Sequence, residues 1–341
     1  KSVIEYILVC TNDEDEQLAL EACEFWSVLA DSDQCQEFLT PLQQYLPQLV
    51  PVLLKCMIYS KMDRIMLDEE SNRPDRDTDI APSNFFVRPK THEFRDSTVT
   101  TSLLETTSIA HIDEDDDDLE DDETFDDLDA QEGHDWNLRK CAASSLDIFS
   151  NVYKNSILPI LLPIIQDRMR PNQPWEVRES AILALGAIAE GCRDGMQEHL
   201  HGLIPYLISV LDDPKPLVRS ITCWTISRYS TWIITQPREK IFQPVLAALL
   251  QKILDMNKRV QEAACSAFAT LEEVAHHLLV PYLKVILETI AKAFTIYQKR
   301  NVFILYDAIR TLTDSVGDNL NNPEYISILM PPLIQKWNKL D

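Results

Sequence analysis

Four carboxylates near the end of the chain are spaced so that they can form an anionic binding surface. Glu262 and Glu273 are 11 positions apart, close to three helical turns, and Asp307 and Asp314 are 7 apart, close to two. Asp307 interrupts an apolar run, and a charge rarely faces a core without a partner. Each pair alone is typical of a solvated helix stripe. Together, the two pairs predict a groove that attracts arginine and lysine side chains.

A tryptophan-bearing apolar face precedes these carboxylates. Ile221, Trp224 and Arg228 lie at i, i+3 and i+7 of a helix predicted over 219–232, and other apolar residues line a second face. A helix that is apolar on two faces is buried or presents one of them to a partner. Tryptophan is a frequent binding anchor, which favours the second interpretation. The alternative is that Trp224 only fills space between packed helices.

A third feature is a run of acidic residues that contains no lysine or arginine. Between positions 113 and 129, 13 of 17 residues are Asp or Glu, so the run repels itself and is expected to be disordered on its own. A tethered acidic segment can compete with a ligand for a basic protein. The alternative is a solubilising insertion. The residues assigned to a regulatory role are Asp113, Glu114, Asp115, Asp116, Asp117, Asp118, Asp121, Asp122, Asp126 and Asp127.

Signatures of catalysis and of metal binding are missing from the sequence. It contains no P-loop, dinucleotide fingerprint, nucleophile elbow or zinc-protease motif. The adjacent His276 and His277 point to different faces of a helix. The eight cysteines stand singly, without a C-x-x-C pair, which is typical of free thiols in a reducing compartment. We therefore expect no catalytic residue, no metal and no cofactor.

The elements that position these residues repeat along the chain. Val177, Val218, Val260 and Val302 open similar apolar helices at spacings of 41, 42 and 42 residues, each after a polar turn and a further apolar helix. Two helices in a period of about 40–47 residues indicate HEAT units. The chain also has only 6 glycines and no sustained alternation of apolar and polar residues. The predicted fold is an all-α HEAT-repeat solenoid.

One hairpin of this array carries a long insertion. The segment 45–57 is predicted to be its first helix and 136–153 its second helix, so 60–135 replaces a short turn. The predicted organisation is about one and a half HEAT repeats over 1–59, an acidic loop over 60–135, and further repeats over 136–341.

Charge narrows the class of partner. The formal net charge is −24, and residues 61–135 contribute −18 of it, from 25 acidic and 7 basic residues. This balance argues against nucleic acid and favours basic proteins. No apolar run reaches the roughly 18 residues of a membrane span, so no membrane insertion is expected. Because Lys1 is not a natural start, we expect a piece of a longer protein.

Several long strings resemble the transportins, or karyopherin-beta-2 proteins, of the importin-beta family. The resemblance covers nearly all of the chain from Asp135 onward, and the inserted loop matches only in its acidity. The matching strings are EACEFW at 21–26, DWNLRKC at 135–141, EGC at 190–192, VRSITCWTISRY at 218–229, NKRVQEAACSAFATLEE at 257–273, ILYDAI at 304–309 and PEYISILMPPLIQKWN at 323–338.

The resemblance implies a nuclear import receptor that works in cytoplasm and nucleus. Such receptors carry basic cargo with a proline-tyrosine nuclear localisation signal through the FG-repeat proteins of the pore. Ran in its GTP form releases the cargo, and the acidic loop couples the two events. The resemblance also implies a monomer.

The matching positions also assign a cargo-binding site. They imply an apolar pocket at Leu183, Ile221 and Trp224, with Asp147 near the tyrosine of the signal and Ser144 where the family has alanine. The basic part of the signal would bind the acidic residues Glu262, Glu273, Asp307 and Asp314. Two other functions stay open, a HEAT scaffold for an enzyme complex and an acidic chaperone for basic proteins.

Overall fold

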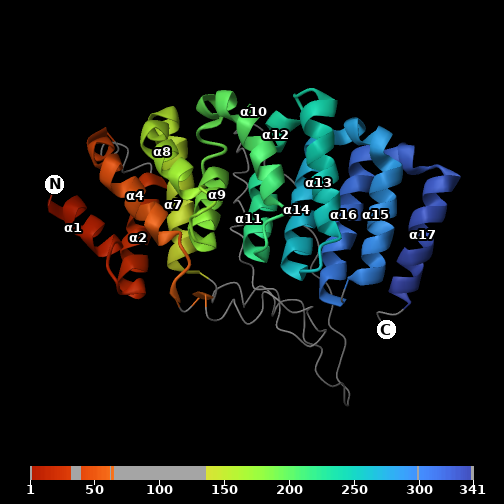
Figure 1. The fold of residues 1–341 in the computed structure, drawn as a ribbon, viewed down its shortest axis with the longest axis horizontal. Helices are drawn as coiled ribbons and strands as arrows, with labels where there is room; N and C mark the ends of the chain where they lie inside the picture. The colour runs from red at the N-terminus through yellow and green to blue at the C-terminus, as the bar shows by residue number, and fades with distance from the viewer. Residues whose placement is uncertain (1, 32–39, 62, 65–135, 298, 339–341) are drawn as a thin grey trace, which may run out of the picture. The chain divides into compact units, whose positions relative to one another are not determined.

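A computed structural model describes residues 2–31, 40–61, 63–64, 136–297 and 299–338, in which every regular element is helical (Figure 1). Apart from Trp136, these residues belong to one compact unit. Most of the predicted insertion, including the acidic residues between Asp113 and Asp127, lies outside the described residues. The all-α prediction is confirmed for the part of the chain that the structure describes.

The longer helices form two layers (Figure 1). In the first, which we call the B layer, each helix packs against the next: α2 (Glu16–Asp31), α7 (Leu138–Tyr153), α9 (Trp175–Ala187), α11 (Pro216–Ser227), α14 (Lys258–Ala275) and α16 (Lys299–Val316). The second, the A layer, contains α4 (Leu46–Cys56), α8 (Leu158–Arg168), α10 (Arg193–Val210), α13 (Gln243–Ile253), α15 (Leu283–Ile296) and α17 (Pro323–Trp337).

Each B helix packs on a helix of the A layer and encloses apolar side chains. The pairs in contact include α4 with α7, α8 with α9, α10 with α11, α13 with α14 and α15 with α16, while α1 (Ser2–Thr11) packs on α2. The largest fully buried side chains include Trp26, Phe149, Phe242 and Phe268. Burial of such side chains between neighbouring hairpins is what stabilises a helical array.

Helix boundaries follow the local chemistry. The side chain of Asn257 caps α14 by accepting hydrogen bonds from the backbone N–H groups of Arg259 and Val260, at 3.0 and 3.4 Å. Two B helices end at residues with positive φ, α7 at Lys154 (φ 51°) and α14 at His276 (φ 42°). These are left-handed positions without glycine, so the scarcity of glycine in the chain does not mean that such turns are absent.

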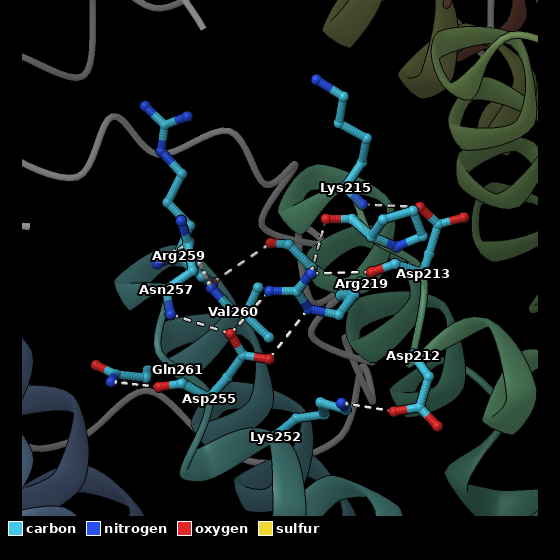
Figure 2. A network of polar contacts seen from close by, with 12 residues as sticks. Asp212, Asp213, Lys215, Arg219, Lys252, Asp255, Asn257, Arg259, Val260 and Gln261 are labelled. Atoms are coloured by element: carbon cyan, nitrogen blue, oxygen red, sulfur yellow. Dashed lines mark hydrogen bonds and ion pairs between the residues drawn. The ribbon is translucent and has the colours of Figure 1, made fainter. Parts of the chain in front are cut away.

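Polar contacts between successive turns hold the repeats in register (Figure 2). The Arg219 guanidinium of α11 forms a two-pronged ion pair with Asp255, at 2.9 and 3.0 Å, and also donates to the backbone oxygen of Asp213 at 2.9 Å. Arg178 of α9 forms an ion pair with Asp213 through a single contact, at 2.6 Å. An arginine on one B helix therefore binds an aspartate in the turn that precedes the next B helix.

One stretch, Leu138–Arg168, has the length and the mean hydropathy, 1.3, of a membrane span. It is not one continuous α-helix, because it divides into α7 and α8 at Lys154, whose positive φ interrupts the helix. Its two halves pack against α9, as expected of helices inside an array.

Candidate functional site

Trp224 lies on a glycine of the preceding B helix. A Cβ atom built on Gly186 of α9 would come within 2.1 Å of Cζ3 of the Trp224 ring, so only glycine leaves room for the indole there. The Trp224 side chain is half-buried, and its indole Nε1 is a buried donor without an acceptor among the described residues. Trp224 therefore does fill space between two repeats, yet part of it stays open to a partner.

An arginine covers one side of this contact. Arg228, one turn after Trp224, donates from Nε to the backbone oxygen of Gly186 at 3.4 Å and from Nη2 to Glu190 at 3.5 Å. The Glu190 side chain is 55% exposed, so this pair lies where solvent screens it. Gly186 thus contacts the indole and also accepts a hydrogen bond from Arg228, which pairs with Glu190.

Two residues of the predicted pocket are mainly structural. Leu183 is 2% exposed and Ile221 is 4% exposed, so both belong to the packed interior of α9 and α11. Next to them, Thr225 of α11 donates to the backbone oxygen of Ile182 on α9 at 2.9 Å and joins the two helices. A ligand would meet only the edges of Leu183 and Ile221, with the larger contact on Trp224.

The two predicted pocket residues on α7 are both partly exposed. Ser144 and Asp147 lie three positions apart, close to one helical turn. The Asp147 carboxylate accepts a hydrogen bond from Nδ2 of Asn151 at 3.2 Å. Because α7 packs on α9 and α9 on α11, the five predicted pocket residues come from three consecutive B helices.

The four predicted acidic residues lie on the two B helices that follow. Glu273, Asp307 and Asp314 are exposed, and Glu262 is half-buried. Helices α14 and α16, which carry them, pack side by side (Figure 1). The exposed carboxylates therefore occupy neighbouring stretches of the B layer.

A fifth carboxylate beside them is fully buried. Glu272 is 0% exposed, and neither of its carboxylate oxygens has a hydrogen-bond partner among the described residues. Burial, with a smaller contribution from the charge of Glu273, raises the pKa of Glu272 to about 9. The side chain is therefore a neutral acid at pH 7. Sequence periodicity separates Glu272 from the exposed stripe but does not indicate that it lacks a partner.

A second buried cluster joins residues that precede and follow the inserted segment. Arg139 of α7 forms a buried ion pair with Glu179 of α9, and its guanidinium lies 4.3 Å from the centre of the Tyr59 ring. Arg64 pairs with Glu176 of α9 at 2.7 Å. Burial raises the pKa of Glu179 to about 7, although Arg139 opposes the shift. Tyr59 and Arg64, the latter at the start of the insertion, are thereby attached to α7 and to α9, the helix that carries Leu183.

The cysteines of the described residues are free and buried. Burial raises the pKa of the Cys192, Cys223 and Cys265 thiols to about 12. Such thiols are poor nucleophiles near neutral pH. Within the described ranges, no group of three or more His, Cys, Asp or Glu side chains could hold a metal ion.

Comparison with known proteins identifies the family. A model of the HEAT-like repeat matches residues 175–229. Transportin-1 of Mus musculus is 50% identical over 99% of this chain and 36% of its own length. Transportin of Dictyostelium discoideum is 46% identical over 100% of the chain, and Importin subunit beta-2 of Schizosaccharomyces pombe is 45% identical over 99%. The chain spans about a third of the length of these relatives.

Solved structures support the fold alone, because their sequences have diverged further. A structure of Kap95p with RanGDP matches 99% of the chain at a TM-score of 0.67 and 15% identity, and covers 34% of that protein. Kap121p bound to Pho4p matches 98% of the chain at a TM-score of 0.67 and 18% identity, and covers 27% of that protein. The transportins of Mus musculus and Dictyostelium discoideum and the importin subunit beta-2 of Schizosaccharomyces pombe are 45–50% identical to this chain along nearly all of its residues. The chain therefore belongs to the transportin family of HEAT-repeat proteins.

Proposed function

We propose that the chain is the cargo-binding part of a nuclear import receptor. Its ligand is a basic peptide segment that ends in a proline-tyrosine pair. The observation that carries the proposal is the order of side chains along the B layer, where the half-buried indole of Trp224 is followed by exposed carboxylates on α14 and α16. An extended peptide with an apolar end and a basic end complements this order.

The apolar end of the ligand binds at α7, α9 and α11. The Trp224 ring, held on Gly186, offers a flat surface to a proline or tyrosine ring. Asp147 on α7 is partly exposed, and its carboxylate accepts a hydrogen bond from the hydroxyl of the ligand tyrosine. Ser144 lies one turn before Asp147 and keeps this part of the surface open because its side chain is small.

The basic end of the ligand binds at α14 and α16. Glu262, Glu273, Asp307 and Asp314 give this surface a formal charge of −4 before Arg310 of α16 is counted. Charge complementarity of this kind speeds encounter and excludes acidic partners. The chain as a whole is strongly acidic, with a net charge of −24, which disfavours nucleic acid as the ligand.

The proposed mechanisms of cargo release and of transport through the nuclear pore rest on analogy with the family. The solved neighbours include Kap95p with RanGDP and Kap95p with Nup1. By analogy, we infer that Ran in its GTP form and FG-repeat proteins of the nuclear pore are partners of the complete receptor, which moves between cytoplasm and nucleus as a monomer. The acidic segment 113–129 couples Ran binding to cargo release by competing for the groove.

A binding measurement with three peptides tests this function. Fluorescence anisotropy would compare a basic peptide that ends in proline-tyrosine, the same peptide with Ala-Ala at that pair, and one with its arginines and lysines replaced by glutamine. We expect the first to bind tightest and each replacement to weaken binding. Equal binding of all three would contradict the proposal and favour a HEAT scaffold.

Deletion of the inserted segment separates receptor from chaperone. Removing residues 66–134 is expected to keep or strengthen peptide binding, because the proposed competitor is gone. Loss of binding on deletion would show that the acidic segment itself holds the ligand, as in an acidic chaperone for basic proteins.

A further inference from the structure

An aromatic side chain stands exposed beside the acidic residues of α16. Phe303 is 56% exposed, although large apolar side chains of the array are mostly enclosed between helices. It lies 4 positions before Asp307 and 11 before Asp314, so the three side chains share one face of α16. No helix of the described part of the chain covers this ring.

The register of α16 against α14 identifies the corresponding position on the neighbouring helix. The buried residues Ala264 and Leu305, Leu271 and Leu312, and Ala275 and Val316 are each 41 positions apart. With the same shift, Phe303 corresponds to Glu262, Asp307 to Ser266 and Asp314 to Glu273. Phe303 therefore continues the stripe that carries the proposed carboxylates.

A further B helix packed against α16 would not by itself be expected to cover Phe303. Helix α14 has B-layer neighbours on both sides, α11 and α16, and yet Glu262 stays partly exposed and Glu273 exposed. Positions on this stripe thus remain open when a B helix is flanked. The ring of Phe303 lies on the face that a ligand reaches.

The charge of α16 differs from that of α14. From Glu262 to Glu273, the charges of α14 that are not buried sum to −2, whereas over the matched span of α16, from Phe303 to Asp314, Asp307, Arg310 and Asp314 sum to −1. Attraction by charge alone is therefore weaker at α16. An aromatic face there supplies a contact that depends on the shape of the ligand cation as well as on its charge.

We propose that Phe303 is a specificity-determining residue of the cargo-binding surface, which stacks on the guanidinium of a ligand arginine while Asp307 binds the same group. The inference rests on the proposed function. A planar guanidinium can lie over a ring and donate hydrogen bonds from its edge to a carboxylate, whereas an ammonium is a compact point charge. Phe303 thereby makes this part of the surface prefer arginine to lysine.

Isothermal titration calorimetry compares the binding of an arginine peptide and of its lysine counterpart to the wild type and to three variants. The peptides end in proline-tyrosine and differ only in their basic residues. The chains are the wild type, Phe303→Ala, Phe303→Leu and, as a control, Val285→Ala, which removes a 47% exposed apolar side chain from α15 of the A layer. We expect Phe303→Ala to weaken the arginine peptide about three- to tenfold and the lysine peptide less than about twofold. Phe303→Leu keeps an apolar side chain but loses the preference for arginine, and Val285→Ala behaves as the wild type.

The Trp224→Ala chain, measured alongside, separates this inference from the proposed function. Unchanged binding to Phe303→Ala together with weakened binding to Trp224→Ala would remove Phe303 from the site and leave the proposed function standing. Equal losses of the arginine and lysine peptides with Phe303→Ala would contradict stacking on guanidinium. If neither variant changes binding, both the inference and the proposed function are wrong.

Discussion

The indole of Trp224 rests on the backbone of Gly186, one B helix away, with space for no Cβ atom between them. Gly186→Ala is expected to displace the ring, weaken binding of a proline-tyrosine peptide and lower stability by about 1–3 kcal/mol through overpacking. Peptide titration and urea unfolding measure the two effects.

Gly202→Ala is the matched control for this change. Gly202 lies in α10 with no atom within 4 Å of a Cβ built on it, so alanine there should stabilise the chain by about 0.5–1 kcal/mol and leave peptide binding unchanged. If Gly186→Ala behaves as Gly202→Ala does, the indole does not depend on the glycine.

The helical repeat and the positions of most helices could be predicted from the sequence, because apolar spacing and capping residues act locally. The contact of Trp224 with Gly186 could not, since it joins residues 38 positions apart on different helices. The one indication of this close approach in the sequence is that Gly186 lies inside an otherwise apolar helix.

The predicted apolar pocket illustrates a second limit. The resemblance grouped Leu183, Ile221 and Trp224 as equals, whereas the packing of α9 on α11 encloses the first two and leaves the third partly open. The predicted spacing of 42 residues from Val260 to Val302 is also one too long, since α14 and α16 begin at Lys258 and Lys299, 41 residues apart, and Val260 therefore corresponds to Asn301.

The buried ion pair between Arg139 and Glu179 is expected to be sensitive to removal of one partner. Arg139→Met leaves a carboxyl group that is 1% exposed without its cation, which should cost about 3–5 kcal/mol. The double variant Arg139→Met/Glu179→Leu should recover most of the loss. Urea unfolding checks both.

A surface pair provides the comparison. Lys284 and Glu324 lie 2.7 Å apart with side chains that are 59% and 52% exposed, so Lys284→Met should change stability by less than about 1 kcal/mol. A similar loss for the buried and the surface pair would mean that burial does not govern the first.

Glu272 predicts an unusual dependence of stability on pH. Its pKa is about 9 in the folded chain and about 4.3 when unfolded, so the folded state holds a proton that the unfolded state releases between these values. Its contribution to stability is therefore present below about pH 4 and is lost progressively as the pH rises toward about 9. Glu272→Gln removes this loss, and its advantage over the wild type in thermal unfolding should grow from pH 5 to pH 8.

Glu198→Gln serves as the control, because the Glu198 side chain is 82% exposed on α10. It should show a much smaller difference from the wild type across the same range. An advantage of Glu272→Gln that does not change with pH would mean that Glu272 is not a neutral buried acid.

The acidic stripe predicts a salt-dependent loss of affinity. Glu262→Gln/Glu273→Gln should weaken a basic peptide about three- to tenfold at low salt, and the difference from the wild type should shrink as salt screens exposed charges. Glu198→Gln removes an 82% exposed carboxylate from α10 in the A layer and should leave affinity nearly unchanged. A loss of binding free energy for Glu198→Gln that is half as large as that of the double variant would mean that only net charge matters.

Trp224 is proposed to bind the proline-tyrosine end of a basic ligand, and isothermal titration calorimetry of such a peptide against Trp224→Ala measures this contact. Trp232→Ala is the control, because Trp232 is also half-buried but packs edge-on against His201, with ring centres 5.1 Å apart. Loss of a central aromatic contact should cost about 2 kcal/mol or more, an affinity at least about thirtyfold lower. We expect this loss for Trp224→Ala and little change for Trp232→Ala. Unchanged affinity of Trp224→Ala, with both variants folded by circular dichroism, would contradict it.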